Sequence, residues 1–127
     1  CHTIDHVRLS RSLTEEELDR EILEGKAQLE TALGAPVDSF AWVGGEEWAY
    51  SAGAARRIAS AFDLVFTTNT RMTRPGTSCL QIDRTQLEAY FPMWLTRFQL
   101  CGFMDLFYAR KRSRVGRLFV PEPMPCA

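Results

Sequence analysis

The fold is decided at residues 37–45, V-D-S-F-A-W-V-G-G. From Phe40 to Val43 this stretch is continuously apolar, a proline precedes it, and two glycines follow it. A short apolar run between turn-forming residues is typical of a buried strand. Residues 37–43 are therefore predicted to form such a strand, and the two glycines to form a turn directly after it.

The segment before this strand predicts a helix over residues 15–33. Thr14 can cap the helix, with Glu17 as its partner in a capping box. Gly34 suits the left-handed residue that follows a helix, and Pro36 prevents the helix from continuing. Apolar residues at helical spacing share one face of this helix: Leu18, Ile22, Leu29 and Leu33.

After the first strand, helical and strand patterns alternate. The predicted elements are a helix at 51–62, a strand at 64–68, a loop at 69–78, a strand at 79–82, and helical structure from residue 85 with a break at Pro92. This alternation implies an α/β fold of parallel units, in an open sheet or in part of a barrel. Both architectures bind ligands beyond the carboxyl ends of the strands. Those ends are the turn at 44–46, residues 67–70, and the Asp83–Arg84 pair.

The composition narrows the classes of protein. A chain of 127 residues is long enough for one domain with a core, and a net charge of −1 gives no general attraction to nucleic acid, so no nucleic-acid partner is expected. The apolar runs are too short to cross a membrane, and no targeting segment is visible. The four cysteines form no CxxC pair, so zinc-knuckle spacing is absent and free thiols are expected.

The strongest functional signal is H-T-I-D-H at residues 2–6, which holds both histidines of the chain. On a helical turn, a spacing of four residues puts two imidazoles on one side, where both can reach one ion. Zinc and similar divalent metals bind imidazole readily, and Asp5 and Thr3 are candidate supporting partners. The alternative is an ordinary pair of surface histidines or a mobile N-terminal stretch.

The order of these segments resembles the polysaccharide deacetylase family, the NodB-like carbohydrate esterases. The resemblance is carried by H-T-I-D-H at 2–6, S-L-T-E-E-E-L-D-R-E-I at 12–22, and F-A-W-V-G-G-E at 40–46. The stretch F-Q-L-C-G-F-M-D-L-F-Y-A-R-K-R at 98–112 is similar to the end of a bacterial exopolysaccharide subgroup. The first half of the chain, to about residue 70, carries most of the likeness.

This resemblance implies part of a distorted (β/α) barrel: a partial domain at residues 1–120 without its N-terminal strands, and a proline-rich tail at 121–127. It implies a metal-dependent hydrolase that removes acetyl groups from a bacterial polysaccharide, in the cytoplasm or the cell envelope. His2 and His6 would be two ligands of a divalent metal, usually zinc in this family. The metal polarises the acetyl carbonyl and activates water.

The chain departs from the family pattern at several places. The family's T-F-D-D-type segment, which supplies a third metal ligand and the general base, would lie before Cys1, and no third histidine is present to act as general acid. Val43 stands where the family has proline, and no arginine precedes Phe40 at the usual spacing. Arg84 is a candidate substitute that would orient the catalytic aspartate. This chain alone is therefore expected to be inactive, and the alternative function is a non-catalytic carbohydrate-binding or assembly module.

Two further groups of residues have open interpretations. Glu46 and Trp48 are candidate substrate-binding residues, although the glutamates at 46 and 47 would also suit the start of a helix. The basic cluster at 110–114 is either a set of cations at a helix C-terminus or a contact for acidic polysaccharide or anionic lipid. The latter makes a peripheral membrane module a third hypothesis.

Overall fold

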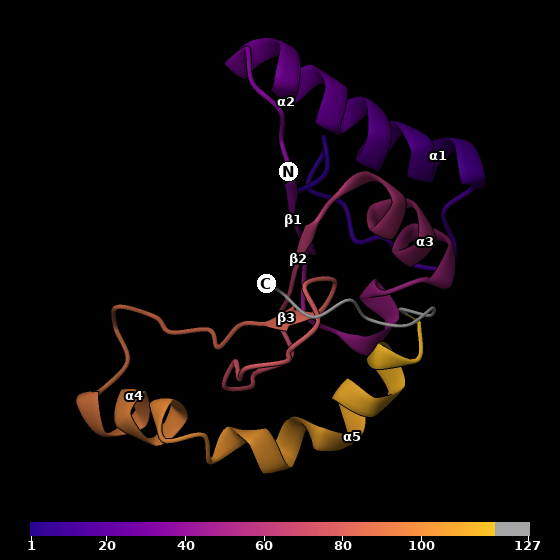
Figure 1. The fold of residues 1–127 in the computed structure, drawn as a ribbon. Helices are drawn as coiled ribbons and strands as arrows, with labels where there is room; N and C mark the ends of the chain where they lie inside the picture. Colours follow the sequence, from indigo (N-terminus) through magenta and orange to yellow (C-terminus); the bar gives the residue numbers. More distant parts are fainter. Residues whose placement is uncertain (119–127) are drawn as a thin grey trace.

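The computed structural model describes residues 1–118, and its centre is a parallel sheet of three strands (Figure 1). The strand order is β1 (Ser39–Ala41), β2 (Leu64–Thr67) and β3 (Ile82–Asp83). In the register, Phe40 pairs with Val65 and Phe66 pairs with Ile82. The predicted α/β class with parallel strands is confirmed. The predicted tail at 121–127 lies outside the described residues.

The first helical segment covers the predicted range 15–33 and includes an unpredicted π-helical turn. It consists of α1 (Glu15–Asp19), the π-helical turn η1 (Arg20–Glu24) and α2 (Gly25–Leu33). The predicted capping box is present: Thr14 Oγ1 accepts from the Glu17 amide, and the Glu17 carboxylate accepts from the Thr14 amide. Gly34 follows the helix with a φ of 65°, a left-handed conformation that glycine adopts without steric cost.

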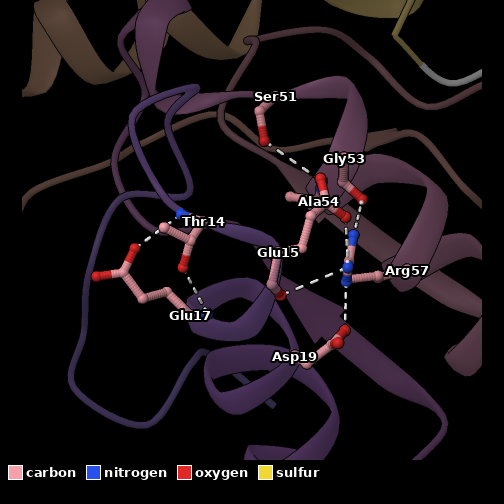
Figure 2. Close-up of polar contacts among 8 residues, drawn as sticks. All are labelled: Thr14, Glu15, Glu17, Asp19, Ser51, Gly53, Ala54 and Arg57. Carbon is pink, nitrogen blue, oxygen red and sulfur yellow. Dashed lines mark hydrogen bonds and ion pairs between the residues drawn. The ribbon is translucent and has the colours of Figure 1, made fainter.

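The next helix, α3 (Ala52–Ala61), packs against α1 and closes the core. Ser51 caps α3 by accepting from the Ala54 amide, and Arg57 of α3 reaches both Glu15 and Asp19 of the first helical segment (Figure 2). The fully buried core side chains come from these helices, from β1 and β2, and from the segments next to them; the largest are Trp42, Tyr50, Phe40, Leu9, Leu18 and Ile22. Burial of Phe40 and Trp42 confirms the prediction of a buried strand.

The second half of the chain departs further from the predicted pattern. The third strand forms at Ile82–Asp83, later than the predicted range 79–82, and no helix begins at residue 85. Instead α4 (Met93–Leu100) begins after Pro92, and α5 (Met104–Gly116) follows a turn at Gly102, whose φ is 76°. Pro92 can precede a helix because its missing amide is not needed there. Figure 1 shows α4 and α5 beyond the strands, away from α1–α3.

Within residues 1–118, the expectation of free thiols is wrong for Cys79. Cys79, in the turn before β3, is disulfide-bonded, whereas Cys1 and Cys101 are free. A chain large enough to have a core can still form a single bridge, so the size of the chain does not predict free thiols. Among residues 1–118, no helix is long and apolar enough to cross a membrane.

Candidate functional site at the carboxyl ends of the strands

The N-terminal segment lies along the outer side of β1 and is fixed there by backbone hydrogen bonds. The Cys1 nitrogen donates to the Ser39 carbonyl at 2.6 Å, and the Ala41 amide donates to the Cys1 carbonyl at 2.9 Å. The buried carboxylate of Glu21, in the π-helical turn, accepts from the amides of Ile4 and Asp5 at 3.0 Å each. These contacts place residues 2–6 beside the carboxyl end of β1.

The two histidine rings lie side by side, although not for the predicted reason. Their centroids are 4.9 Å apart with an interplanar angle of 63°. Residues 2–6 are not helical, which makes the prediction of a helical turn wrong. Thr3 and His6 instead adopt left-handed φ values of 62° and 54°. For a β-branched residue such as Thr3 this conformation is strained, by about 1–3 kcal/mol, and strain of this kind concentrates at functional sites.

A hydrogen bond fixes the tautomer of His2. Its Nδ1 lies 2.6 Å from the Ala41 carbonyl oxygen. A carbonyl oxygen only accepts, so Nδ1 carries a proton, and in the neutral imidazole the lone pair is then on Nε2. Metal-binding histidines commonly donate their second nitrogen to a backbone carbonyl in this way. The bond to Ala41 therefore orients the His2 ring as such a bond orients a metal ligand.

The histidine pair could supply two of the ligands of a metal ion, which is fewer than a metal site normally needs. Within residues 1–118, no group of three His, Cys, Asp or Glu side chains is placed to hold one ion. Asp5, a candidate supporting partner, is engaged by Arg20 at 2.7 Å. Zinc is almost always held by at least three protein ligands, so further ligands would have to join His2 and His6.

A cleft of about 540 Å³ opens at the carboxyl ends of the strands and brings three of the predicted site residues together: His2, Glu46 and Arg84 line it. His6 and Trp48 are not among its lining residues. Trp48 is 60% exposed and lines a separate hollow, and Arg8 lies 5.5 Å from the centre of its ring.

The Gly44–Gly45 turn forms one wall of this cleft and has no room for side chains. A Cβ atom on Gly45 would lie 2.6 Å from Thr68 Oγ1, and Gly44 has a φ of 75°. Thr68, which follows β2, donates its hydroxyl to the Gly44 carbonyl at 2.8 Å. Gly44 has the left-handed backbone that glycine adopts readily, and the bond from Thr68 ties this segment, which follows β1, to the end of β2.

Glu46 is held as a carboxylate by Arg8. The Arg8 guanidinium donates through Nε and Nη2 to the two carboxylate oxygens, each at 3.0 Å. Hydrogen bonding to Arg8, with help from the backbone amides of Glu46 and Gly45, lowers the pKa of Glu46 to about 2. The short 3₁₀ helix η2 (Glu47–Ala49) begins one residue later. Glu46 therefore both lines the cleft and precedes a helix.

Arg84 follows β3 directly and lines the cleft. Its amide and its Nε both donate to the Thr67 carbonyl, at 3.2 and 3.1 Å. Its two terminal nitrogens have no partner among the described residues. The neighbouring Asp83 is buried and accepts from Thr67 Oγ1 at 2.5 Å, and burial raises its pKa.

Lys111 completes the cleft, and sequence reasoning missed it. Its ammonium donates to the Gly45 carbonyl and lies 5.2 Å from the centre of the Tyr108 ring. Burial lowers the pKa of Lys111. The available signal was helical spacing, since positions 108 and 111 share one face of α5. Within the basic cluster at 110–114, Lys111 is the member that lines the cleft.

Two other cations of the basic cluster, Arg112 and Arg114, hold α5 against the rest of the protein. Arg112 donates to the Thr70 carbonyl at 2.6 Å and, within α5, to the Asp105 carbonyl at 2.5 Å. Arg114 pairs with Glu47 at 2.6 Å. Arg110 is exposed. The cluster thus has an internal role, and a contact with anionic lipid stays a prediction.

Comparison with known proteins adds no assignment, because neither a protein-family model nor a curated protein matches this chain.

Proposed function

We propose that this chain is part of a metal-dependent hydrolase that removes acetyl groups from an acetylated bacterial polysaccharide, on a domain that is part of a distorted (β/α) barrel. The supporting observation is the histidine pair at the carboxyl end of β1, with rings 4.9 Å apart and with Nε2 of His2 left free by its bond to Ala41. The parallel sheet and the position of the cleft agree with this class of fold.

His2 and His6 would hold the metal, and zinc suits imidazole ligands. When bound, a divalent metal supplies Lewis acidity that polarises an acyl carbonyl and lets water attack near neutral pH. Arg84 would be a positioning residue. Its two free terminal nitrogens can hold a catalytic carboxylate bidentately and keep it ionised. The carboxylate would come from outside the described residues, as would the third metal ligand.

Zinc affinity tests the role of the histidines. Calorimetry should detect zinc binding to the chain and a loss of about tenfold or more in His6→Ala, because removing even a supporting partner of a ligand costs about 10–100-fold. Thr31→Ala, an exposed position on α2, is the control and should bind as the unmodified chain does. Equal zinc affinities for the chain and His6→Ala would remove the basis of the proposal.

Activity provides a second test. This chain alone should release no acetate from acetylated oligosaccharides, because two imidazoles without a third ligand and a base do not complete a hydrolytic site. Acetate release by the purified chain that a chelator abolishes would show that the base and the third ligand lie within these residues.

The exposed Trp48 supports a second candidate, a non-catalytic carbohydrate-binding module. Its indole is 60% exposed beside a hollow, as a side chain that stacks on a sugar would be. Trp94, which is 68% exposed on α4, is a matched control. If Trp48→Ala abolishes oligosaccharide binding, Trp94→Ala preserves it, and His6→Ala leaves zinc affinity unchanged, the binding module replaces the hydrolase.

A further inference from the structure

The lining of the cleft carries more positive than negative side chains. It includes three cations, Arg8, Arg84 and Lys111, and one carboxylate, Glu46. Arg8 and Glu46 form an ion pair with each other. Arg84 and Lys111 form no ion pair within the described residues, although Glu46, Glu47 and Asp83 lie near enough to Lys111 to favour its charged form.

Both of these cations are held in place by backbone carbonyls and keep unused donors. Arg84 is fixed through Nε to the Thr67 carbonyl, which leaves its two terminal nitrogens free. Lys111 is fixed to the Gly45 carbonyl and has two further N–H groups with no partner among residues 1–118. A carbonyl orients a cation but does not neutralise its charge. The two side chains are thus oriented in advance on the wall of one cleft.

The position of Lys111 makes its charge costly unless an anion binds. The side chain is half-buried, between the Gly–Gly turn and the Tyr108 ring. Taking an ammonium group out of water is unfavourable without a partner of opposite charge, and the pKa of Lys111 is lowered for this reason. The nearby carboxylates do not form an ion pair with Lys111, so an anionic ligand in direct contact would offset the cost of burial, and the attraction would be stronger than in water because the site is partly dry.

We propose that Lys111 binds the carboxylate of an acidic sugar, with Arg84 adding positive charge to the same cleft, so that the polysaccharide taken by this cleft contains uronic acid units. This inference deepens the proposed function, since it depends on that function for the sugar and names its class. A carboxylate fits because it is a common acidic group of sugars and accepts charge-assisted hydrogen bonds from the N–H groups that Lys111 leaves unused. A neutral amino sugar polymer would offer Lys111 no group of opposite charge.

The test is a calorimetric or NMR titration of the metal-free chain with an oligomer of galacturonic acid. A neutral oligomer of N-acetylglucosamine of the same length and inorganic phosphate serve as comparison ligands. The galacturonate oligomer should bind more tightly than either. Its affinity should fall about tenfold or more in Lys111→Gln, because a charge-assisted hydrogen bond is lost, and binding should weaken as salt is added.

Arg110→Gln is the matched control. It removes the same charge from the neighbouring position of the same helix, but Arg110 is exposed and does not line the cleft. It should change the affinity for galacturonate less than twofold, as expected for a charge that acts only through screened solvent. Equal losses of galacturonate affinity in Lys111→Gln and Arg110→Gln would mean that only the net charge of the chain matters. That result would contradict a binding site at Lys111.

The comparison ligands separate the remaining outcomes. Equal affinity for the neutral oligomer would contradict the acidic substrate class, and so would phosphate binding without galacturonate binding. These titrations contain no metal, so their failure leaves zinc binding by His2 and His6 intact. Conversely, unchanged zinc affinity in His6→Ala would contradict the proposal of a metal-dependent hydrolase. It would not contradict the binding of an acidic sugar at Lys111.

Discussion

The body around β1 and the pair of helices α4 and α5 contain similar apolar side chains and use them in opposite ways. In the body, Phe40 is 0% exposed and Trp42 is 1% exposed. In the helix pair, Trp94 and Phe107 are each 68% exposed. In the body, the sheet and the helices α1–α3 bury one another's apolar side chains. By contrast, α4 buries no residue and α5 buries only Val115.

This difference shows that an apolar pattern predicts a helix without predicting what covers it. Residues 93–117 carry six cations and one acid, and several of the cations reach back to the body. Polar contacts therefore position α5, while its apolar side chains near Leu106 stay open. Stability should accordingly depend on the body far more than on α4 and the start of α5.

The largest expected effect contrasts two phenylalanines. Phe40→Ala should lower the free energy of unfolding by about 3–5 kcal/mol, because it leaves a cavity between the sheet and the helices. Phe107→Ala should change it by less than about 0.5 kcal/mol, since the ring is already in water. Urea denaturation of both variants measures the contrast. Equal losses would mean that α5 is packed in solution as tightly as the core.

A smaller effect is expected at the contact between α1 and α3. Arg57 donates to the carboxylates of Asp19 and Glu15 and is itself 17% exposed (Figure 2). Arg57→Ala should lower the free energy of unfolding by about 1–2 kcal/mol, because charge-assisted hydrogen bonds are lost at a partly dry site. Arg56→Ala, its exposed neighbour, is the control and should have little effect. The same measurement for both variants decides whether the pairing or only the net charge matters.

The start of α1 should contribute somewhat less. Thr14→Ala removes one half of the capping box and should cost about 1 kcal/mol. Thr31 is an exposed threonine within α2 whose hydroxyl donates to the Ala27 carbonyl, so Thr31→Ala should be neutral or slightly stabilising through helix propensity. A denaturation midpoint that is unchanged in Thr14→Ala would count against a role for the cap in solution.

The same contrast explains how far the sequence could predict the structure. Local signals sufficed where the determining atoms are neighbours in the chain, as in the cap at Thr14, the left-handed Gly34 and the strand around Phe40. Local signals were not sufficient where contacts between residues far apart in the chain determine the structure. The π-helical turn contains Glu21, whose carboxylate binds the amides of Ile4 and Asp5.

The candidate site divides in the same way. The histidine pair was visible as a motif, but its geometry depends on left-handed residues that no local propensity indicates. His2, Glu46 and Arg84 were predictable as residues at strand ends, and the structure places them on one cleft. Helical spacing places Lys111 on the same face as Tyr108, but its contact with Gly45 could not be predicted, because Gly45 lies 66 residues earlier in the chain.

The smallest expected effect concerns Asp83, at the junction between the two regions. Burial raises its pKa above the usual value of about 3.8. Between the unfolded-state pKa and the raised folded-state pKa, the folded protein binds more protons than the unfolded chain. The free energy of unfolding therefore falls as pH rises through this interval. Asp83→Asn keeps an acceptor for Thr67 Oγ1 and removes the buried charge. The variant should therefore gain stability relative to the unmodified chain at pH 7 and lose that advantage near pH 3.

Asp63→Asn is the control for this prediction. It makes the same change of charge at an exposed position and should not show this pH dependence. Urea denaturation at a series of pH values measures the difference. An advantage of Asp83→Asn that is constant with pH would mean that packing of the amide, and not the buried charge, is responsible.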